Sequence, residues 1–467
     1  MYSPERNLPA RFDPGKFKQG SDEVDLSTAV NLRWVAKLGS QAYGNAVVAS
    51  GKVLIGTNND NPRDPQHQGD RSILLCLSEE DGSFLWQLVI PKLKEGKAND
   101  WDGIGLLSSP AVEGNRVYLV TTRCEVVCLD LNGMADGNDG PFTNEAEYVV
   151  ADTGAPPATI GPHDGDIIWL YNMMDELGVF PHNAANSSPL VVGDLVYTCT
   201  SNGHDWTHSN VPSPFSPSFI ALCKNRGVLA AEDDANIGPR ILHGQWSSVT
   251  AAVLDGKPFL FCAGGDGFLY ALDALPSRKA GKAVLRTIWW YDCNPHEYRF
   301  NKDGTPARYP APNGPSEIVA TPVFYNNRVY VATGQDPEHG DGAGCLVCVK
   351  ASGQGNVTST ATVWSFRKIR RSLSTVSIDP DSGLLFVADL AGYVYCLDAA
   401  TGDLFWTHDM KAHVWGSTLV AGDRVFVADE DGDLTVLSAA KEKNVLFEVN
   451  LGAPAYSTPV AANGTVY

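Results

Sequence analysis

The stretch LAGYVYCLDAATGDLFW, Leu390–Trp406, contains two apolar runs on either side of the turn sequence AATGD. Apolar residues recur in these runs with a period of two, which predicts β-strands. The preceding sequence STVSIDPDSGLLFVAD (374–389) adds two more such runs around a turn rich in Asp and Gly. The unit therefore predicts four consecutive strands joined by tight turns, which is a small antiparallel sheet.

Similar units recur along the whole sequence. Their first strands begin at NAVVAS, SSPAVE, SSPLVV, WSSVTA, ATPVFY, STVSID and HVWGST. The last copy, YSTPVAANGTVY (456–467), has only two strands, and NLRWVAKLG (31–39) is predicted as a lone fourth strand. Seven complete units and one split unit predict an all-β, eight-bladed β-propeller of four-stranded antiparallel blades, in which the N-terminal strand closes the last blade. We accordingly expect an N-terminal extension at 1–30 and a single propeller at 31–467 whose C-terminal blade is truncated.

Cysteine and tryptophan occupy repeated positions of the unit. A third-strand position holds Cys76, Cys128, Cys223, Cys348 and Cys396, and Ala or Val takes it elsewhere. A fourth-strand position holds Trp34, Trp86, Trp169, Trp364 and Trp406. A position shared by Cys, Ala and Val is small and buried, and we expect the tryptophans to pack between neighbouring blades. The zinc-like spacing CLVC (345–348) lies along a strand, which points its two sulfurs to opposite faces.

Composition and charge exclude several classes of function. The formal net charge is -19, so most of the surface would repel DNA or RNA, and we expect no nucleic-acid partner. The sequence has no apolar run of 18 residues, so we expect no membrane-spanning segment. Its polar, Pro-rich start is not a signal peptide. We expect that both ends continue in a longer gene product, so this start does not decide the compartment.

The repeats LDAATGDLFW (397–406) and DGFLYALD (266–273) resemble those of the quinoprotein, or PQQ-like repeat, propeller superfamily. That superfamily contains calcium- and pyrroloquinoline-quinone-dependent dehydrogenases, and also non-catalytic members similar to BamB. The resemblance implies a dehydrogenase site with adjacent cysteines and a Glu, Asn and Asp trio. The sequence has no adjacent cysteines, and we find no matching trio.

We therefore expect a non-catalytic, periplasmic or otherwise exported scaffold that binds a protein or a polysaccharide. A quinoprotein-type oxidoreductase, dependent on PQQ and calcium or on another metal, is the alternative. The sequence identifies no cofactor with certainty. Calcium is a candidate, and PQQ is disfavoured.

In a propeller, loops that enter first strands and loops that join second to third strands share one face. Five long insertions fall on that face, among them NNDNPRDPQHQGD (58–70) and SNGHDWTHSNVPSPFSP (201–217). Long loops on a rigid ring commonly carry binding sites. Most histidines lie in or beside these loops, and two interpretations stay open. They are ordinary polar loop residues, or some of them converge on a metal or an acid–base site.

The residues that enter the first strands should line a central funnel. This predicted funnel set is Asp102, Asn183, Asn186, Gln245, Trp246, Glu317, Arg371, His413 and Trp415. Amide, charged and indole groups together suit a polar ligand with a flat or sugar-like face. The nearby basic run RKIRR (367–371) is either a solvated loop or an anion-binding patch at the mouth.

One loop has oxygen-bearing residues at spacings that could wrap a calcium ion. They are Asp130, Asn132, Asp136, Asn138 and Asp139. The loop lacks EF-hand spacing, and an exposed turn is the alternative. It lies away from the predicted funnel, so any calcium bound there would be structural.

Overall fold

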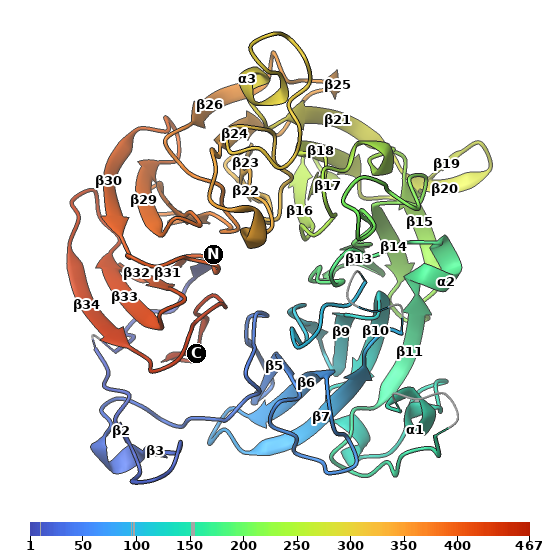
Figure 1. The fold of residues 1–467 in the computed structure, drawn as a ribbon, viewed down its shortest axis with the longest axis vertical. Helices are drawn as coiled ribbons and strands as arrows, with labels where there is room; N and C mark the ends of the chain where they lie inside the picture. The colour runs from blue at the N-terminus through green and yellow to red at the C-terminus, as the bar shows by residue number, and fades with distance from the viewer. Residues whose placement is uncertain (10, 95, 97–98, 151–154) are drawn as a thin grey trace.

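The alternating runs form strands, and the repeats fold into the blades of a ring around a central axis (Figure 1). The computed structural model describes residues 1–9, 11–94, 96, 99–150 and 155–467. Within them, seven blades have four antiparallel strands each. The colour order of Figure 1 shows that these blades follow one another around the ring in sequence order. The prediction of an all-β propeller is therefore confirmed.

The first three blades contain the following strands. They are β4 (Val47–Ala49), β5 (Lys52–Asn58), β6 (Arg71–Ser78) and β7 (Phe84–Pro91); β8 (Ala111–Glu113), β9 (Arg116–Thr121), β10 (Glu125–Asp130) and β11 (Ile167–Asn172); β12 (Leu190–Val192), β13 (Leu195–Cys199), β14 (Phe219–Cys223) and β15 (Leu229–Asp233). The hairpin β19 (Ser277–Lys279) and β20 (Lys282–Leu285) extends the third sheet at its outer edge.

The other four blades contain these strands. They are β16 (Thr250–Leu254), β17 (Lys257–Ala263), β18 (Phe268–Asp273) and β21 (Thr287–Asp292), with β25 (Gly355–Asn356) added; β22 (Val323–Tyr325), β23 (Arg328–Ala332), β24 (Leu346–Lys350) and β26 (Thr362–Phe366); β27 (Ser377–Ile378), β28 (Leu384–Ala388), β29 (Tyr393–Asp398) and β30 (Leu404–Asp409); β31 (Leu419–Ala421), β32 (Arg424–Ala428), β33 (Asp433–Ser438) and β34 (Val445–Asn450).

Short helical elements occur only in the connections of the described chain. They are α1 (Glu145–Tyr148), α2 (Met173–Leu177), α3 (His296–Arg299) and the 3-10 turns η1 (Leu26–Thr28), η2 (Gly133–Ala135), η3 (Gly238–Arg240) and η4 (Pro337–His339). None of these helices has the length and hydropathy needed to cross a bilayer.

The prediction of eight four-stranded blades is wrong. The last repeat supplies only the hairpin β35 (Ala461–Ala462) and β36 (Thr465–Val466), and residues 32–38 pair with no strand in the described chain. A blade needs a third strand between these two segments to carry the hydrogen bonds. A cavity of about 460 Å³ lies there instead, lined by apolar side chains of the first and seventh blades such as Ile55 and Phe426.

The N-terminal segment joins the ring differently from the prediction. The strand β1 (Tyr2–Ser3) pairs in parallel with β31, the innermost strand of the seventh blade. The hairpin β2 (Lys16–Phe17) and β3 (Val24–Asp25) lies outside the ring, next to the gap between the last and first blades (Figure 1). We call the hairpin β35–β36 together with residues 32–38 the eighth sector.

Tryptophans dock six of the eight sectors onto the next one, as predicted for the packing between blades. The indole N–H of Trp364 donates to the Ala399 carbonyl in the following blade at 3.1 Å, and that of Trp406 donates to Ala440 at 2.9 Å. Trp34 does the same from the eighth sector, because its indole donates to the Glu79 carbonyl of the first blade at 3.0 Å. The eighth sector therefore fills a blade position without forming a complete blade.

The predicted cysteine position is confirmed in four blades and needs one correction. Cys76 and Cys396 lie directly opposite Trp86 and Trp406 on the fourth strand, with a bulge after each cysteine. In the third blade the bulge follows Ala221, so Ala221 holds this position and Cys223 lies two residues later. All ten cysteines are free thiols.

A belt of hydrogen bonds encircles the axis at the start of the first strands. In seven of the eight steps around the axis, the backbone N–H of one residue donates to a side-chain oxygen of its equivalent in the next sector, as from Ser417 to Thr458 at 2.8 Å. The step from Ser248 to Thr321 lacks this bond among the described residues. The belt joins the last sector to the first, because the Thr458 N–H donates to Asn45 Oδ1 at 2.8 Å. Its members are Asn45, Ser109, Ser188, Ser248, Thr321, Thr375, Ser417 and Thr458.

Candidate ligand-binding funnel

Two residues before each belt residue, one side chain per sector points into the axis and lines a cavity of about 560 Å³. This set of eight equivalent positions contains Tyr43, Leu107, Asn186, Trp246, Val319, Leu373, Trp415 and Tyr456. The eight sectors thus contribute equally to the funnel although only seven of them are complete blades. The volume lies within the range of about 300–1,000 Å³ that is usual for small-molecule sites.

One side of the funnel presents a cluster of aromatic rings. The rings of Tyr43 and Tyr456 are stacked with their centroids 4.9 Å apart, and Trp415 lies edge-on to Tyr456 at 5.2 Å. Trp246 lines the funnel from the fourth blade, halfway around the ring, and Trp101 lines it from the connection before the second blade. The funnel therefore offers flat apolar faces on two sides.

The polar groups of the funnel are amides and carboxylates. Asp60, Asp102, Asp336 and Glu338 line the cavity, and no lysine or arginine is among the described residues that do so. Asn183 donates from Nδ2 to Asp336 Oδ2 at 3.1 Å. The buried side-chain oxygens of Asn183 and Asn186 have no hydrogen-bond partner among the described residues. These carbonyl oxygens could accept hydrogen bonds from a bound ligand.

A cluster of histidines lies behind this wall. His182 is fully buried and His243 is 1% exposed, and their Nε2 atoms are 2.7 Å apart. The exposed His208 packs edge-on to both rings, with centroid distances of 5.0 and 4.8 Å. The indole N–H of Trp246 donates to the His182 carbonyl at 3.2 Å, which joins the cluster to the funnel. One ring nitrogen from each histidine lies within 4.8 Å of the others, so the three could hold a metal ion.

Burial keeps the two inner histidines neutral. Desolvation lowers the pKa of His182 to about 3, with a smaller effect from His243. The same cause lowers the pKa of His243 to about 3. His182 Nδ1 lies 2.7 Å from the His204 carbonyl, which can only accept, so Nδ1 carries the proton and Nε2 is left as a lone pair.

A tyrosine and a glutamate contact His243 from its other side. Tyr309 Oη lies 3.1 Å from His243 Nδ1 and also 3.1 Å from Glu317 Oε1. Glu317 is fully buried, and burial raises the pKa of its carboxyl group to about 7. His339 adds a fourth imidazole, with its ring centroid 4.8 Å from that of His243.

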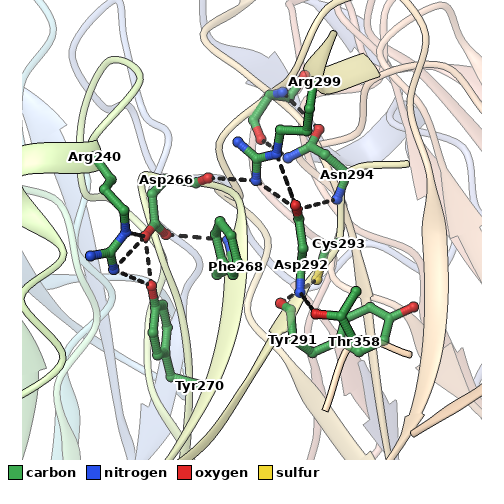
Figure 2. A network of polar contacts seen from close by, with 11 residues as sticks. Arg240, Asp266, Phe268, Tyr270, Tyr291, Asp292, Cys293, Asn294, Arg299 and Thr358 are labelled. Carbon is green, nitrogen blue, oxygen red and sulfur yellow. Dashed lines mark hydrogen bonds and ion pairs between the residues drawn. The ribbon is translucent and has the colours of Figure 1, made fainter. Parts of the chain in front are cut away.

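The loop between β21 and β22 carries Tyr309 and Glu317, and a polar network fixes its start to the fourth blade (Figure 2). Arg299 forms an ion pair with Asp292 at 2.6 Å and donates to the Asp266 carbonyl at 2.9 Å. Asp266 in turn accepts from Arg240 and Tyr270. Asn294 exchanges two hydrogen bonds with the backbone of Ser316, which ties the end of the loop to its start.

The structure brings together only part of the predicted funnel set. Five of its nine residues line the cavity: Asp102, Asn183, Asn186, Trp246 and Trp415. Gln245 instead bonds the backbone of Ala263 and Gly265 within the core. Glu317 belongs to the histidine cluster.

His413 and Arg371 also lie outside the cavity lining. His413 pairs with Glu430 at 2.9 Å. Arg371 is 1% exposed and donates to the Ala311 carbonyl. The basic run therefore does not form a patch in the funnel, and its Arg367 pairs with Glu297 on α3.

The polar residues of the predicted calcium loop form hydrogen bonds with one another and with neighbouring residues. Asp130 accepts from Arg116 at 2.6 Å and from Asn115 and the Asn132 N–H. Asn132 donates to Asp136 at 2.9 Å. Asn138 donates to Glu145, and the Asp139 N–H donates to Asp166. Calcium binding by these residues stays a prediction.

Sequence reasoning missed Tyr43, Tyr456, Trp101 and the carboxylates of Asp60, Asp336 and Glu338. The two tyrosines had a usable signal, because they stand at the same position of the repeat as Trp246 and Trp415. Trp101 and the carboxylates lie in insertions outside the repeat, and their positions depend on how those loops fold.

Comparisons with known proteins agree with this architecture. A sequence profile of the family described as outer membrane protein assembly factor BamB matches residues 353–467. The crystal structure of BamB from Moraxella catarrhalis superposes with a TM-score of 0.52 at 13% identity, covering 91% of this chain and 90% of that one. The chain is a β-propeller of PQQ-like repeats.

Two further solved structures are similar to the chain to different degrees. The computationally designed Ika8 protein has a TM-score of 0.50 at 10% identity, covering 93% of this chain and 95% of that one. Quinohemoprotein alcohol dehydrogenase from Comamonas testosteroni has a TM-score of 0.45 at 12% identity, covering 90% of this chain and 76% of that one. A comparison with curated protein sequences finds no match. At these identities the likeness describes the PQQ-like fold and leaves the function of this propeller to its own residues.

Proposed function

We propose that this PQQ-like propeller is an exported, non-catalytic binding protein that takes a saccharide into its funnel. The observation that carries the proposal is the set of aromatic faces at equivalent repeat positions, led by Trp246, Trp415 and Tyr456. Aromatic rings stack on the apolar face of a sugar ring while amides and carboxylates bond its hydroxyl groups. The lining has both kinds of group within one cavity.

The charge of the lining supports a neutral or amine-bearing saccharide. Asp60, Asp102, Asp336 and Glu338 would repel an acidic sugar, and no basic side chain among the described lining residues would compensate. The same argument weighs against a quinoprotein oxidoreductase. PQQ carries several carboxylates, and this lining does not fit an anionic quinone.

The rim supports a ligand longer than one sugar unit. Trp206 lies on the loop between β13 and β14 with its ring 6.2 Å from that of Trp101, so aromatic surface continues from the cavity to the mouth. Phe215 on the same loop is 86% exposed. A polysaccharide chain could follow this surface out of the funnel.

The likeness to BamB supports the exported location, and with it a second role as a scaffold for a protein partner. The buried thiols are compatible with an exported location and with a reducing compartment. Nine of the ten cysteines are buried and all ten are free thiols, so this fold is built without a disulfide bond. The exposed Phe215 and Trp206 would contact a protein in the same way as a glycan.

A panel of oligosaccharides tests the proposal by isothermal titration calorimetry. The panel should hold neutral, amine-bearing and acidic chains, and we expect binding of the first two classes only. Trp415→Ala and Trp246→Ala should each weaken binding by about tenfold or more, because each removes one stacking face. Trp290→Ala, on the outer strand β21, is the matched control and should bind as the parent protein does. Binding of no panel member, or equal binding by all three variants, would refute the proposal.

A further inference from the structure

We propose that His182, His208 and His243 form a binding site for a divalent transition-metal ion, with zinc as the best match. The three side chains each offer a ring nitrogen within 4.8 Å of the others. Zinc takes imidazole ligands, and a set of three histidines leaves one tetrahedral position for water or another ligand. This inference is independent of saccharide binding, because it uses residues behind the funnel wall.

The protonation of His182 suits a metal ligand. Its Nδ1–H donates to the His204 carbonyl at 2.7 Å, so its Nε2 presents a lone pair toward His243 and His208. A histidine that binds a metal usually donates its other N–H to a carbonyl or carboxylate, which fixes both tautomer and ring orientation. His182 already has this outer contact.

His243 has an outer contact of the same kind through Tyr309. In the metal-free protein the His243 Nε2–H donates to His182 Nε2, since the latter holds the lone pair. When a metal takes Nε2, the proton of the neutral ring moves to Nδ1, where it can donate to Tyr309 Oη at 3.1 Å. The tyrosine O–H can then donate to Glu317 Oε1 at 3.1 Å. The ring stays neutral in both states, and each hydrogen bond has one donor and one acceptor.

His208 supplies the third ligand from an exposed loop. The turn that carries it is closed by the His208 N–H to the Asp205 carbonyl at 3.0 Å and by the Asp205 N–H to Asn210 at 2.8 Å. His208 has a φ of 54°, in the left-handed region, and its ring nevertheless lies against the two buried imidazoles. Metal binding also requires a small opening of the cluster. Nitrogens bound to a tetrahedral zinc are about 3.4 Å apart, against 2.7 Å for His182 and His243 here.

The second candidate group in the described chain is less suitable. Asp64, His67 and Asp164 also lie within reach of one another. However, Asp64 accepts from the Gln66 N–H and side-chain amide, and Asp164 accepts from the Gly161 N–H. Both carboxylates therefore already accept hydrogen bonds that stabilise the turns in which they lie.

Zinc titration of the chelator-treated full chain tests the site by calorimetry. We expect one zinc ion per chain, and a cobalt-loaded sample should show the visible absorption of tetrahedral Co²⁺. His208→Asn is the main variant, since asparagine tolerates the left-handed backbone and the residue is exposed, so the variant should fold. It should weaken zinc binding by more than about 100-fold and remove the cobalt absorption, whereas Tyr309→Phe should weaken binding by about 10–100-fold.

Two further variants complete the test. His296→Ala, an exposed histidine on α3, and His67→Ala should bind zinc as the parent chain does. Near-ultraviolet circular dichroism without metal should show that all variants are folded. The proposal is overturned if the parent chain binds no stoichiometric zinc, if His208→Asn retains full affinity, or if the loss of binding follows His67→Ala instead.

Discussion

At the scale of single residues, the carboxyl group of Glu317 beside the histidine cluster has few hydrogen-bond donors to offset its burial. Its carboxyl group is fully buried, and Oε2 has no hydrogen-bond partner among the described residues. The Tyr309 O–H and the Asp336 N–H both lie beside Oε1. Burial therefore raises the pKa from 4.5 to about 7, because the charged form loses more solvation than these two donors return.

This raised pKa predicts a stability change with pH. The contribution of Glu317 is fully present below pH 4.5, where it is protonated in both states, and is lost as pH rises toward 7. The loss amounts to as much as about 3 kcal/mol in the free energy of unfolding. Glu317→Gln should remove this part of the pH dependence. Urea unfolding of chelator-treated protein at pH 5 and pH 8 measures it, and identical pH dependence in parent and variant would contradict the assignment.

Thiol chemistry also differs between residues. Cys223 is only partly buried, and a hydrogen bond from Arg226 lowers its pKa, whereas burial raises the pKa of Cys76 and Cys396 to about 12. Since the thiolate is the reactive form, a thiol reagent should label one cysteine in the native protein and all ten after unfolding. Cys223→Ser should abolish native labelling. Rapid native labelling of several cysteines would show that the blades open more readily than this structure implies.

At the scale of elements, the contact between tryptophan and the turn glycine of the next blade joins one blade to another. A Cβ atom on Gly402 would lie 2.6 Å from the Trp364 ring, and one on Gly82 would lie 2.5 Å from Trp34. These glycines also have positive φ, so they combine a turn conformation with the space for an indole. The sequence ATGD therefore encodes both the turn and the docking site.

Two alanine substitutions in the sixth blade separate these two roles. Gly383→Ala, with φ 71° and nothing within 4 Å of a new Cβ, should cost about 1–2 kcal/mol of unfolding free energy from backbone strain alone. Gly402→Ala, with φ 78°, should cost a further 1–3 kcal/mol or so because Trp364 must move. Chemical denaturation of both variants measures the difference. Equal losses would mean that the tryptophan contact is unimportant.

The repeat predicted these elements well because its apolar alternation and turns are local signals. The strands, the Cys–Trp pairs and the packing between blades all follow from one repeated four-strand pattern. In the third blade the predicted position was wrong by two residues. Ala221, which precedes the bulge, takes the place that the sequence assigned to Cys223. The funnel carboxylates could not be predicted, because Asp336 and Glu338 lie on an insertion whose path is set by contacts such as that of Asn183 with Asp336.

At the scale of the whole molecule, the ring has eight positions but seven complete blades. The belt passes through the eighth sector to Asn45 of the first blade, and Trp34 docks the eighth sector onto that blade like the other tryptophans. The sequence predicted eight four-stranded blades, and this is wrong because the eighth sector has only one hairpin and an unpaired segment. It could not show whether residues 32–38 would be hydrogen-bonded, because a lone strand segment becomes part of a sheet only when a neighbouring strand is present.

The hydrogen bond from the Thr458 N–H to Asn45 joins the eighth sector to the first blade, and we expect the ring to open first at this junction. Asn45→Ala leaves the Thr458 N–H without its acceptor and should lower the free energy of unfolding by about 1–2 kcal/mol. Hydrogen–deuterium exchange should rise in β35–β36 and stay unchanged in β5–β6. Ser109→Ala removes an equivalent belt bond between complete blades and serves as the control, with no effect on β35–β36. Unchanged exchange in β35–β36 of Asn45→Ala would show that other contacts hold the ring closed.

The most direct test of the central claim is a crystal structure of the protein with an oligosaccharide that binds in the calorimetric panel. The account predicts a sugar ring in the funnel, stacked on Trp415 or Trp246, with hydroxyl groups bonded to Asn183 or Asn186. A sugar bound only on the outer surface, with these aromatic rings left uncontacted, would contradict the account.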